Sequence, residues 1–144
     1  MGLKVFAFVD QQDPLPGARV ESIVVLAAWA TWCRPCLWEL PEIERAYQRF
    51  AGNRHVVFLS VDRGSAEETP ARATGYFKKT RLSIPLAFED AGFAAVLDSD
   101  ALPVVVVLDR QGRMRFVHHG YDASEHLDDL LSRTIGQLLD EPER

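Results

Sequence analysis

Two cysteines, Cys33 and Cys36, are the only thiols in the sequence, and two residues separate them. They stand where an apolar run, Ile23 to Ala30, meets a segment with helical periodicity. At the first turn of a helix, free backbone N–H groups and the positive end of the helix dipole stabilise a thiolate. The spacing therefore predicts a redox pair, in which Cys33 attacks a disulfide and Cys36, one turn further on, resolves the mixed disulfide that forms.

Two other interpretations of the pair stay open. The same spacing occurs in half of a zinc site, but zinc takes about four ligands. The chain has no further cysteine and no pair of histidines at the spacing that zinc sites use. Two inert buried thiols are the second alternative, because free cysteine often behaves as a small core residue. The sequence favours a redox pair over both, and we expect no metal site.

The elements around the pair are typical of an α/β protein. The run Ile23–Trp29 is continuously apolar and rich in branched residues, which indicates a strand buried on both faces of a sheet. Apolar residues from Leu37 to Phe50 recur at spacings of three and four, and Pro35 suits a first turn, so a helix follows the cysteines. A second buried strand over 55–61 then gives a parallel pair with a right-handed crossover.

The rest of the chain contains further strand and helix signals. Asp122, with Glu125 three residues on, resembles a capping box at the start of a last helix. The other predicted elements are a strand over 3–9, a helix over 69–81 capped by Thr69, a strand over 86–88, a helix over 93–97, a hairpin of strands 103–108 and 113–118, and the last helix, which ends at Leu139.

Length and composition describe one ordinary domain. The chain has 144 residues, of which 47% are hydrophobic and 26% charged, enough to bury a core of its own. We predict a single domain over 1–144, with an N-terminal extension over 1–22 and a core over 23–139. The net charge of -5, without a basic run, argues against nucleic acid or an anionic membrane surface as partner. No apolar stretch approaches the roughly 20 residues that span a bilayer.

The segment 28–41, AWATWCRPCLWELP, resembles the active site of the thioredoxin superfamily. It is most similar to the TlpA/ResA-like branch, in which W-A-x-W-C-x-P-C is followed by E-x-P, and the order of elements extends the likeness to about residues 23–139. The resemblance implies a thioredoxin fold: a central mixed sheet with helices on both faces, an N-terminal extension and an inserted helical segment. It also implies reversible redox chemistry on protein disulfides, as a reductant, without a bound cofactor.

The resemblance implies a surface that receives the target. Pro103 matches the cis-proline that lies against the cysteine pair in this family, and with Leu102 it would hold the backbone of the target. The alternative is an ordinary trans proline at the start of a strand. Trp32, Arg34 and Pro35, around the cysteines, would contact the same target.

The resemblance also implies a proton carrier. Glu39 matches an acidic residue three positions after the second cysteine, where it could exchange protons with Cys36 on the same helix face. The alternative is a solvated surface glutamate, because glutamate is rarely buried without a partner. Thioredoxins proper carry a buried aspartate six positions before the first cysteine, where this chain has Ala27. That departure strengthens the case for Glu39.

The implied partners are protein disulfides or dithiols and a redox partner that recharges the pair, with a membrane-bound electron donor as one candidate. A monomer is expected. The first residues lack the pattern of a secretory signal, which indicates the cytoplasm if the chain is complete. A chain whose leader or anchor had been trimmed would look the same, and would belong to the periplasm or another extracytoplasmic space.

Two other functions remain open at the level of sequence. A thiol peroxidase of the peroxiredoxin type would use a related fold, although its peroxidatic cysteine has a different setting from W-C-x-x-C. A redox-inactive binding module would keep the fold and lose the chemistry. Peroxide turnover would identify the first, and cysteines that do not respond to redox buffers would identify the second.

Overall fold

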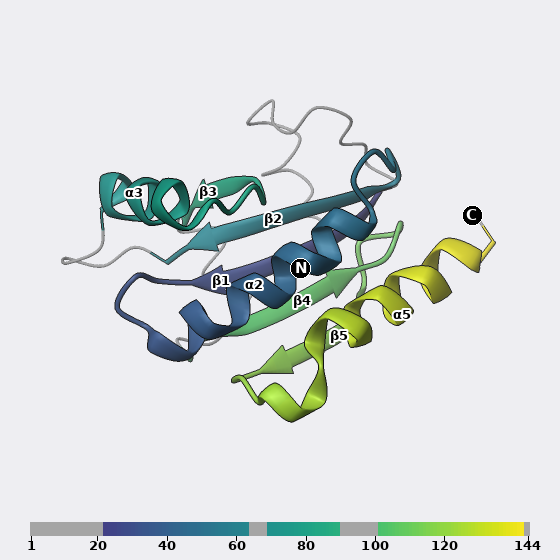
Figure 1. The fold of residues 1–144 in the computed structure, drawn as a ribbon. Helices are drawn as coiled ribbons and strands as arrows, with labels where there is room; N and C mark the ends of the chain where they lie inside the picture. Colours follow the sequence, from purple (N-terminus) through teal and green to yellow (C-terminus); the bar gives the residue numbers. More distant parts are fainter. Residues whose placement is uncertain (1–21, 64–68, 90–100, 143–144) are drawn as a thin grey trace.

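A five-stranded mixed sheet runs through the middle of the protein in the computed structural model (Figure 1), which describes residues 22–63, 69–89 and 101–142. The strand order is β3-β2-β1-β4-β5. β1 is parallel to β2 and antiparallel to β4, β2 is parallel to β3, and β4 and β5 form an antiparallel hairpin. The strands are β1 Ile23–Trp29, β2 Val56–Asp62, β3 Leu86–Phe88, β4 Val104–Leu108 and β5 Met114–His119. This is the mixed sheet that the sequence predicts.

Three helices cover one face of the sheet. They are α2 (Arg34–Arg49), α3 (Pro70–Thr80) and α5 (Leu127–Asp140), and their buried residues join those of alternate strand positions in one apolar cluster. Side chains on the opposite face of the strands form a second buried cluster. The sequence predicts helices on both faces of the sheet. Within the described ranges, this prediction is confirmed for the face that α2, α3 and α5 cover. The strand predicted over 3–9 and the helix predicted over 93–97 lie outside those ranges.

Local sequence explains the central unit β1-α2-β2. All seven residues of β1 are buried, as its unbroken apolar run predicts. β1 pairs with β4 so that Ala28 lies opposite Val104, which brings the start of β4 beside the end of β1. At the end of β1 the chain therefore leaves the sheet beside the start of β4, and it runs from there into α2. None of the helices in the described ranges is long and apolar enough to cross a lipid bilayer.

The start of α5 differs from the prediction. Asp122 caps a separate 3-10 helix, η1 (Ala123–Glu125), where its Oδ1 accepts a hydrogen bond from the Ser124 N–H at 2.9 Å. α5 begins only at Leu127, and the residue before it provides no side-chain cap. Its Leu127 N–H donates to Oε1 of Glu42, on α2, at 2.8 Å. The capping-box prediction is therefore wrong, because the acceptor comes from another helix.

Candidate redox site

The two cysteines lie at the first turn of α2 and are joined by a disulfide, with their Cα atoms 5.3 Å apart. Cys33 is the N-cap residue, and its sulfur accepts a hydrogen bond from the Cys36 N–H at 3.3 Å. Cys33 is 5% exposed and Cys36 1% exposed. When the pair is reduced, this amide and the positive end of the helix stabilise a thiolate on Cys33, the more exposed of the two residues.

The segment between β1 and α2 fixes this geometry. A tight turn after Trp29 is closed by a hydrogen bond from the Cys33 N–H to the Ala30 carbonyl, at 3.1 Å. Pro35 then occupies the first turn of α2, where its missing N–H leaves no donor unpaired and its fixed φ suits a helix. The backbone around the disulfide is thus set by short-range interactions.

The surface beside the disulfide is rich in exposed aromatic area. Trp32 and Trp38 are each 57% exposed, and Arg34 and Pro35 are exposed as well. Large apolar side chains in this position offer a contact surface to another molecule. Trp32, Arg34 and Pro35 were expected here from the sequence; Trp38 is exposed two residues after Cys36.

The peptide bond between Leu102 and Pro103 is cis, as the resemblance predicts. Pro103 is buried and Leu102 is partly buried. Both precede Val104, the residue paired with Ala28, so they lie at the same end of the sheet as the segment that runs from β1 to Cys33. The sheet therefore brings two segments some 70 residues apart in sequence to one end of the molecule.

Glu39 is buried, so the alternative of a solvated surface glutamate is wrong. It is 2% exposed, and its Oε2 has no hydrogen-bond partner among the described residues. Burial, and after it the charge of Glu42, raises the pKa of Glu39 to about 8. Glu39 follows Cys36 by three residues in α2, which places both on one side of the helix. A carboxyl with a pKa so close to that of a thiol can exchange protons with one.

The sequence did not point to Glu42 and Tyr121. Glu42 is 6% exposed, and its Oε2 accepts a hydrogen bond from the hydroxyl of Tyr121, a residue between β5 and η1. The available signal was the spacing of three between Cys36, Glu39 and Glu42. Nothing in the sequence alone shows that this side of α2 is covered by the chain that follows β5.

A pair of cysteines at the start of the helix that follows a central strand, at the same end of the sheet as a cis-proline that precedes the neighbouring strand, is the arrangement of redox proteins with the thioredoxin fold. The comparison with protein families agrees with this class. A family model described as thioredoxin-like matches residues 21–114. The chain therefore belongs to the thioredoxin-like family.

Known proteins with similar sequences include thioredoxin-like protein YneN of Bacillus subtilis (strain 168), 28% identical over 108 residues, which covers 75% of this chain and 62% of YneN. Thiol-disulfide oxidoreductase ResA of Bacillus thuringiensis subsp. konkukian (strain 97-27) is 26% identical over 111 residues, covering 76% of this chain and 62% of ResA. The chain thus spans about 62% of the length of these relatives.

Solved structures show the same fold. The crystal structure of StoA from Bacillus subtilis has a TM-score of 0.65 and 20% sequence identity, and the match covers 77% of this chain and 83% of StoA. At this identity the similarity establishes the shared fold.

The buried carboxyl of Glu39 should make stability depend on pH. Its pKa of about 8 in the folded protein exceeds the ordinary value of 4.5, so the folded state binds the proton more tightly than the unfolded state. Its contribution to stability is then complete below about pH 4.5 and is lost as the pH rises through about 8. Glu39→Gln should abolish this loss and raise the free energy of unfolding at pH 9 by about a few kcal/mol. Urea denaturation of the oxidised protein at pH 4, 7 and 9 measures it.

Glu44→Gln is the matched control on the same helix. Burial raises the pKa of Glu44, but hydrogen bonds from Ser83, Gln48 and Ile84 outweigh burial and lower it. Glu44→Gln should therefore lose stability at neutral pH, the opposite sign. A Glu39→Gln variant no more stable than the wild type at pH 9 would contradict the assignment of Glu39 as a buried, high-pKa carboxyl.

Proposed function

We propose that this protein is a thiol-disulfide oxidoreductase that acts on protein disulfides through Cys33 and Cys36. The observation that carries the proposal is the disulfide at the N-terminus of α2, where the sulfur of the N-cap residue accepts a backbone hydrogen bond. Membership of the thioredoxin-like family supports it. So do relatives that are themselves named thiol-disulfide oxidoreductases.

In the reducing direction, the reaction proceeds in two exchanges. The Cys33 thiolate attacks one sulfur of the target disulfide, the target S–S bond breaks, and the other target sulfur leaves as a thiolate that takes up a proton. Cys36 then loses its proton and attacks Cys33, which releases the second target thiol and forms the Cys33–Cys36 disulfide. Two electrons pass from the protein to the target, and a partner dithiol returns them.

Glu39 carries the proton of the second exchange. Cys36 is only 1% exposed, so bulk water has poor access to its thiol. The Glu39 carboxylate accepts the Cys36 proton as the new disulfide forms, and it returns this proton when the pair is recharged. A pKa of about 8 suits both directions, because proton transfer is easiest between groups of similar affinity.

The target binds at the end of the sheet that carries the disulfide. Leu102 and Pro103 hold its backbone, and Trp32, Arg34 and Pro35 contact its side chains. The exposure of Trp32, together with that of Arg34 and Pro35, supports this surface. The protein acts as a monomer, and the partner that recharges it is a dithiol protein. The TlpA/ResA-like resemblance favours one that is anchored in a membrane.

Substitution of the two cysteines should separate the two exchanges. Cys33→Ser should reduce the rate of insulin disulfide reduction to the level without protein, because the nucleophile is gone. Cys36→Ser should instead accumulate a mixed disulfide between Cys33 and the target, which mass spectrometry of the acid-quenched reaction detects. A wild-type protein that turns over hydrogen peroxide but leaves disulfides intact would identify a thiol peroxidase and contradict the proposal.

Removal of the proton carrier should slow the second exchange and spare the first. In Glu39→Gln, resolution of a preformed mixed disulfide between Cys33 and glutathione should slow by about 100-fold at pH 7, within the range for loss of a general base. Rapid-quench kinetics follow this step. Glu44→Gln serves as the control. Equal resolution rates in Glu39→Gln and wild type would exclude Glu39 as proton carrier and leave the cysteine chemistry intact.

The reduction potential should show the direction of electron flow. A reductant is expected near the thioredoxin end of the scale, at about -270 mV. Equilibration in dithiothreitol buffers with thiol trapping measures the Cys33–Cys36 couple. A value near the oxidising end, at about -120 mV, would assign the protein as a disulfide donor instead. Failure to oxidise in any buffer would leave only a binding module.

A further inference from the structure

Three buried side chains follow one line along α2 at intervals of three residues: Cys36, Glu39 and Glu42. Residues three apart share a face of a helix, so each is the neighbour of the next. The resolving thiol stands at one end of the line. A second buried carboxyl group, which takes no part in the reaction described above, stands at the other.

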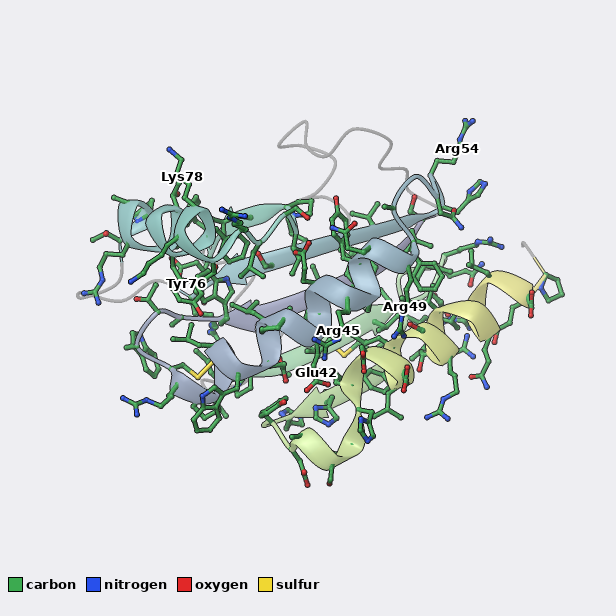
Figure 2. All side chains as sticks on the ribbon, viewed as in Figure 1. Glu42, Arg45, Arg49, Arg54, Tyr76 and Lys78 are labelled. Carbon is green, nitrogen blue, oxygen red and sulfur yellow. A yellow bond between two sulfur atoms is a disulfide. The ribbon has the colours of Figure 1, made fainter. Side chains whose placement is uncertain are left out.

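Both oxygens of Glu42 are bound from outside α2. Oε1 accepts a hydrogen bond from the Leu127 N–H at the first turn of α5, at 2.8 Å, and Oε2 accepts one from the Tyr121 hydroxyl. Figure 2 shows Glu42 where α2 faces the start of α5. The hydrogen bond to Glu42, with burial, raises the pKa of Tyr121 to about 12. The hydroxyl therefore stays a donor throughout the range in which thiols titrate.

A cap for α5 does not require a charge at this position. A single acceptor oxygen satisfies the Leu127 N–H, and the amide of a glutamine has one. Glu42 instead places a carboxylate in the buried interior, one helical turn from the carboxyl of Glu39, where like charges repel. Capping α5 therefore does not explain why a second carboxyl group lies so close to Glu39.

We propose that Glu42, held by Tyr121 and by the first turn of α5, is a positioning residue for the redox reaction: it makes Glu39 accept the Cys36 proton during resolution and hold that proton while the pair is oxidised. The inference rests on the proposed function of Glu39 as proton carrier. The negative charge of Glu42 strengthens Glu39 as a base and brings its proton affinity near that of a thiol. The Cys36 proton then moves onto Glu39 during resolution and back during recharging, with no other change of charge in the site.

Several other charged or titratable groups lie on the elements packed against this part of α2. Arg45, on α2 itself, is paired with Asp128 of α5 at 3.0 Å. His118, on β5, is bonded through Nε2 to Glu125 at 3.0 Å. In the same row of the sheet, β4 contributes Val105 and β1 contributes Ala27, which are apolar. Among the described residues, Tyr121 and His126, the residue before Leu127, also lie here.

The titration of the Glu39 carboxyl tests the proposal directly. Glutamate labelled with ¹³C at the side-chain carboxyl gives each group its own NMR signal, so His118 and the thiols do not interfere. The midpoint of Glu39 should lie near pH 8 in the wild type and fall by roughly one pH unit in Glu42→Gln, which keeps the shape and the acceptor for α5. Glu44→Gln should leave it unchanged. The pH profile of mixed-disulfide resolution should move with the Glu39 midpoint.

Tyr121→Phe keeps both carboxyl groups and the α5 cap, and carries the same test if Glu42→Gln does not fold. Without the hydroxyl, the Leu127 N–H alone of these two donors holds the Glu42 carboxyl beside Glu39, and the Glu39 midpoint should fall below its wild-type value. A Glu39 titration unchanged by either substitution overturns the proposal. The role of Glu39 as proton carrier is tested separately. If the Glu39→Gln variant resolves the mixed disulfide as fast as the wild type, that role is excluded.

Discussion

The backbone N–H of Cys36 donates to the sulfur of Cys33, and the rest of the protein is arranged to keep this contact at the end of the central strand. The contact exists only if the chain turns from strand to helix within four residues of Trp29. β1 provides the rigid starting point, because its seven residues are buried and paired on both sides. The cis bond before Pro103 precedes the first residue of the neighbouring strand, β4, at the same end of the sheet. Redox chemistry at this place therefore depends on the packing of the central strand.

Packing between α2 and α5 has a second task besides burying apolar area. Arg45 and Arg49 lie on α2 where it faces α5 (Figure 2). Both form ion pairs with Asp128, at 3.0 and 3.3 Å, which fixes α5 along α2. Arg49 and Arg45 are partly exposed, so each pair contributes little to stability by itself. Their geometric effect is larger, because the same register places Leu127 within hydrogen-bond distance of Glu42. An ion pair far from the disulfide thus helps to determine the surroundings of Glu39.

Local patterns predicted most of the fold, and contacts between distant segments account for what they missed. The apolar run of β1 and the spacing in α2 depend on near neighbours, so both elements begin and end within a residue or two of their predictions. Likewise, Thr69 caps α3, where its Oγ1 accepts from the Arg72 N–H at 3.2 Å. The start of α5 could not be predicted in this way, since its acceptor belongs to Glu42, 85 residues earlier.

The residues of the candidate site differ in the same way: some have a local sequence signal, and others depend on contacts with distant segments. Cys33 and Cys36 are recognisable because their function needs only each other and a helix start. Glu39 could be named from its spacing, but no local pattern in the sequence shows that it is buried. No local sequence pattern identifies Tyr121: it is one tyrosine after a strand, and its place in the proposed mechanism rests on a hydrogen bond to a residue 79 positions away.

Ala27 gives these observations a common cause. It lies on the central strand, 2% exposed, at the position where thioredoxins proper carry a buried aspartate. With no carboxyl on the strand, the buried acid comes from α2, at Glu39. A carboxyl on a helix is sensitive to whatever packs against that helix, and here α5 and the segment after β5 supply the hydrogen bonds that hold the neighbouring Glu42. In the proposed mechanism, an acid on the helix and not on the strand thus couples proton exchange at Cys36 to the docking of the C-terminal helix.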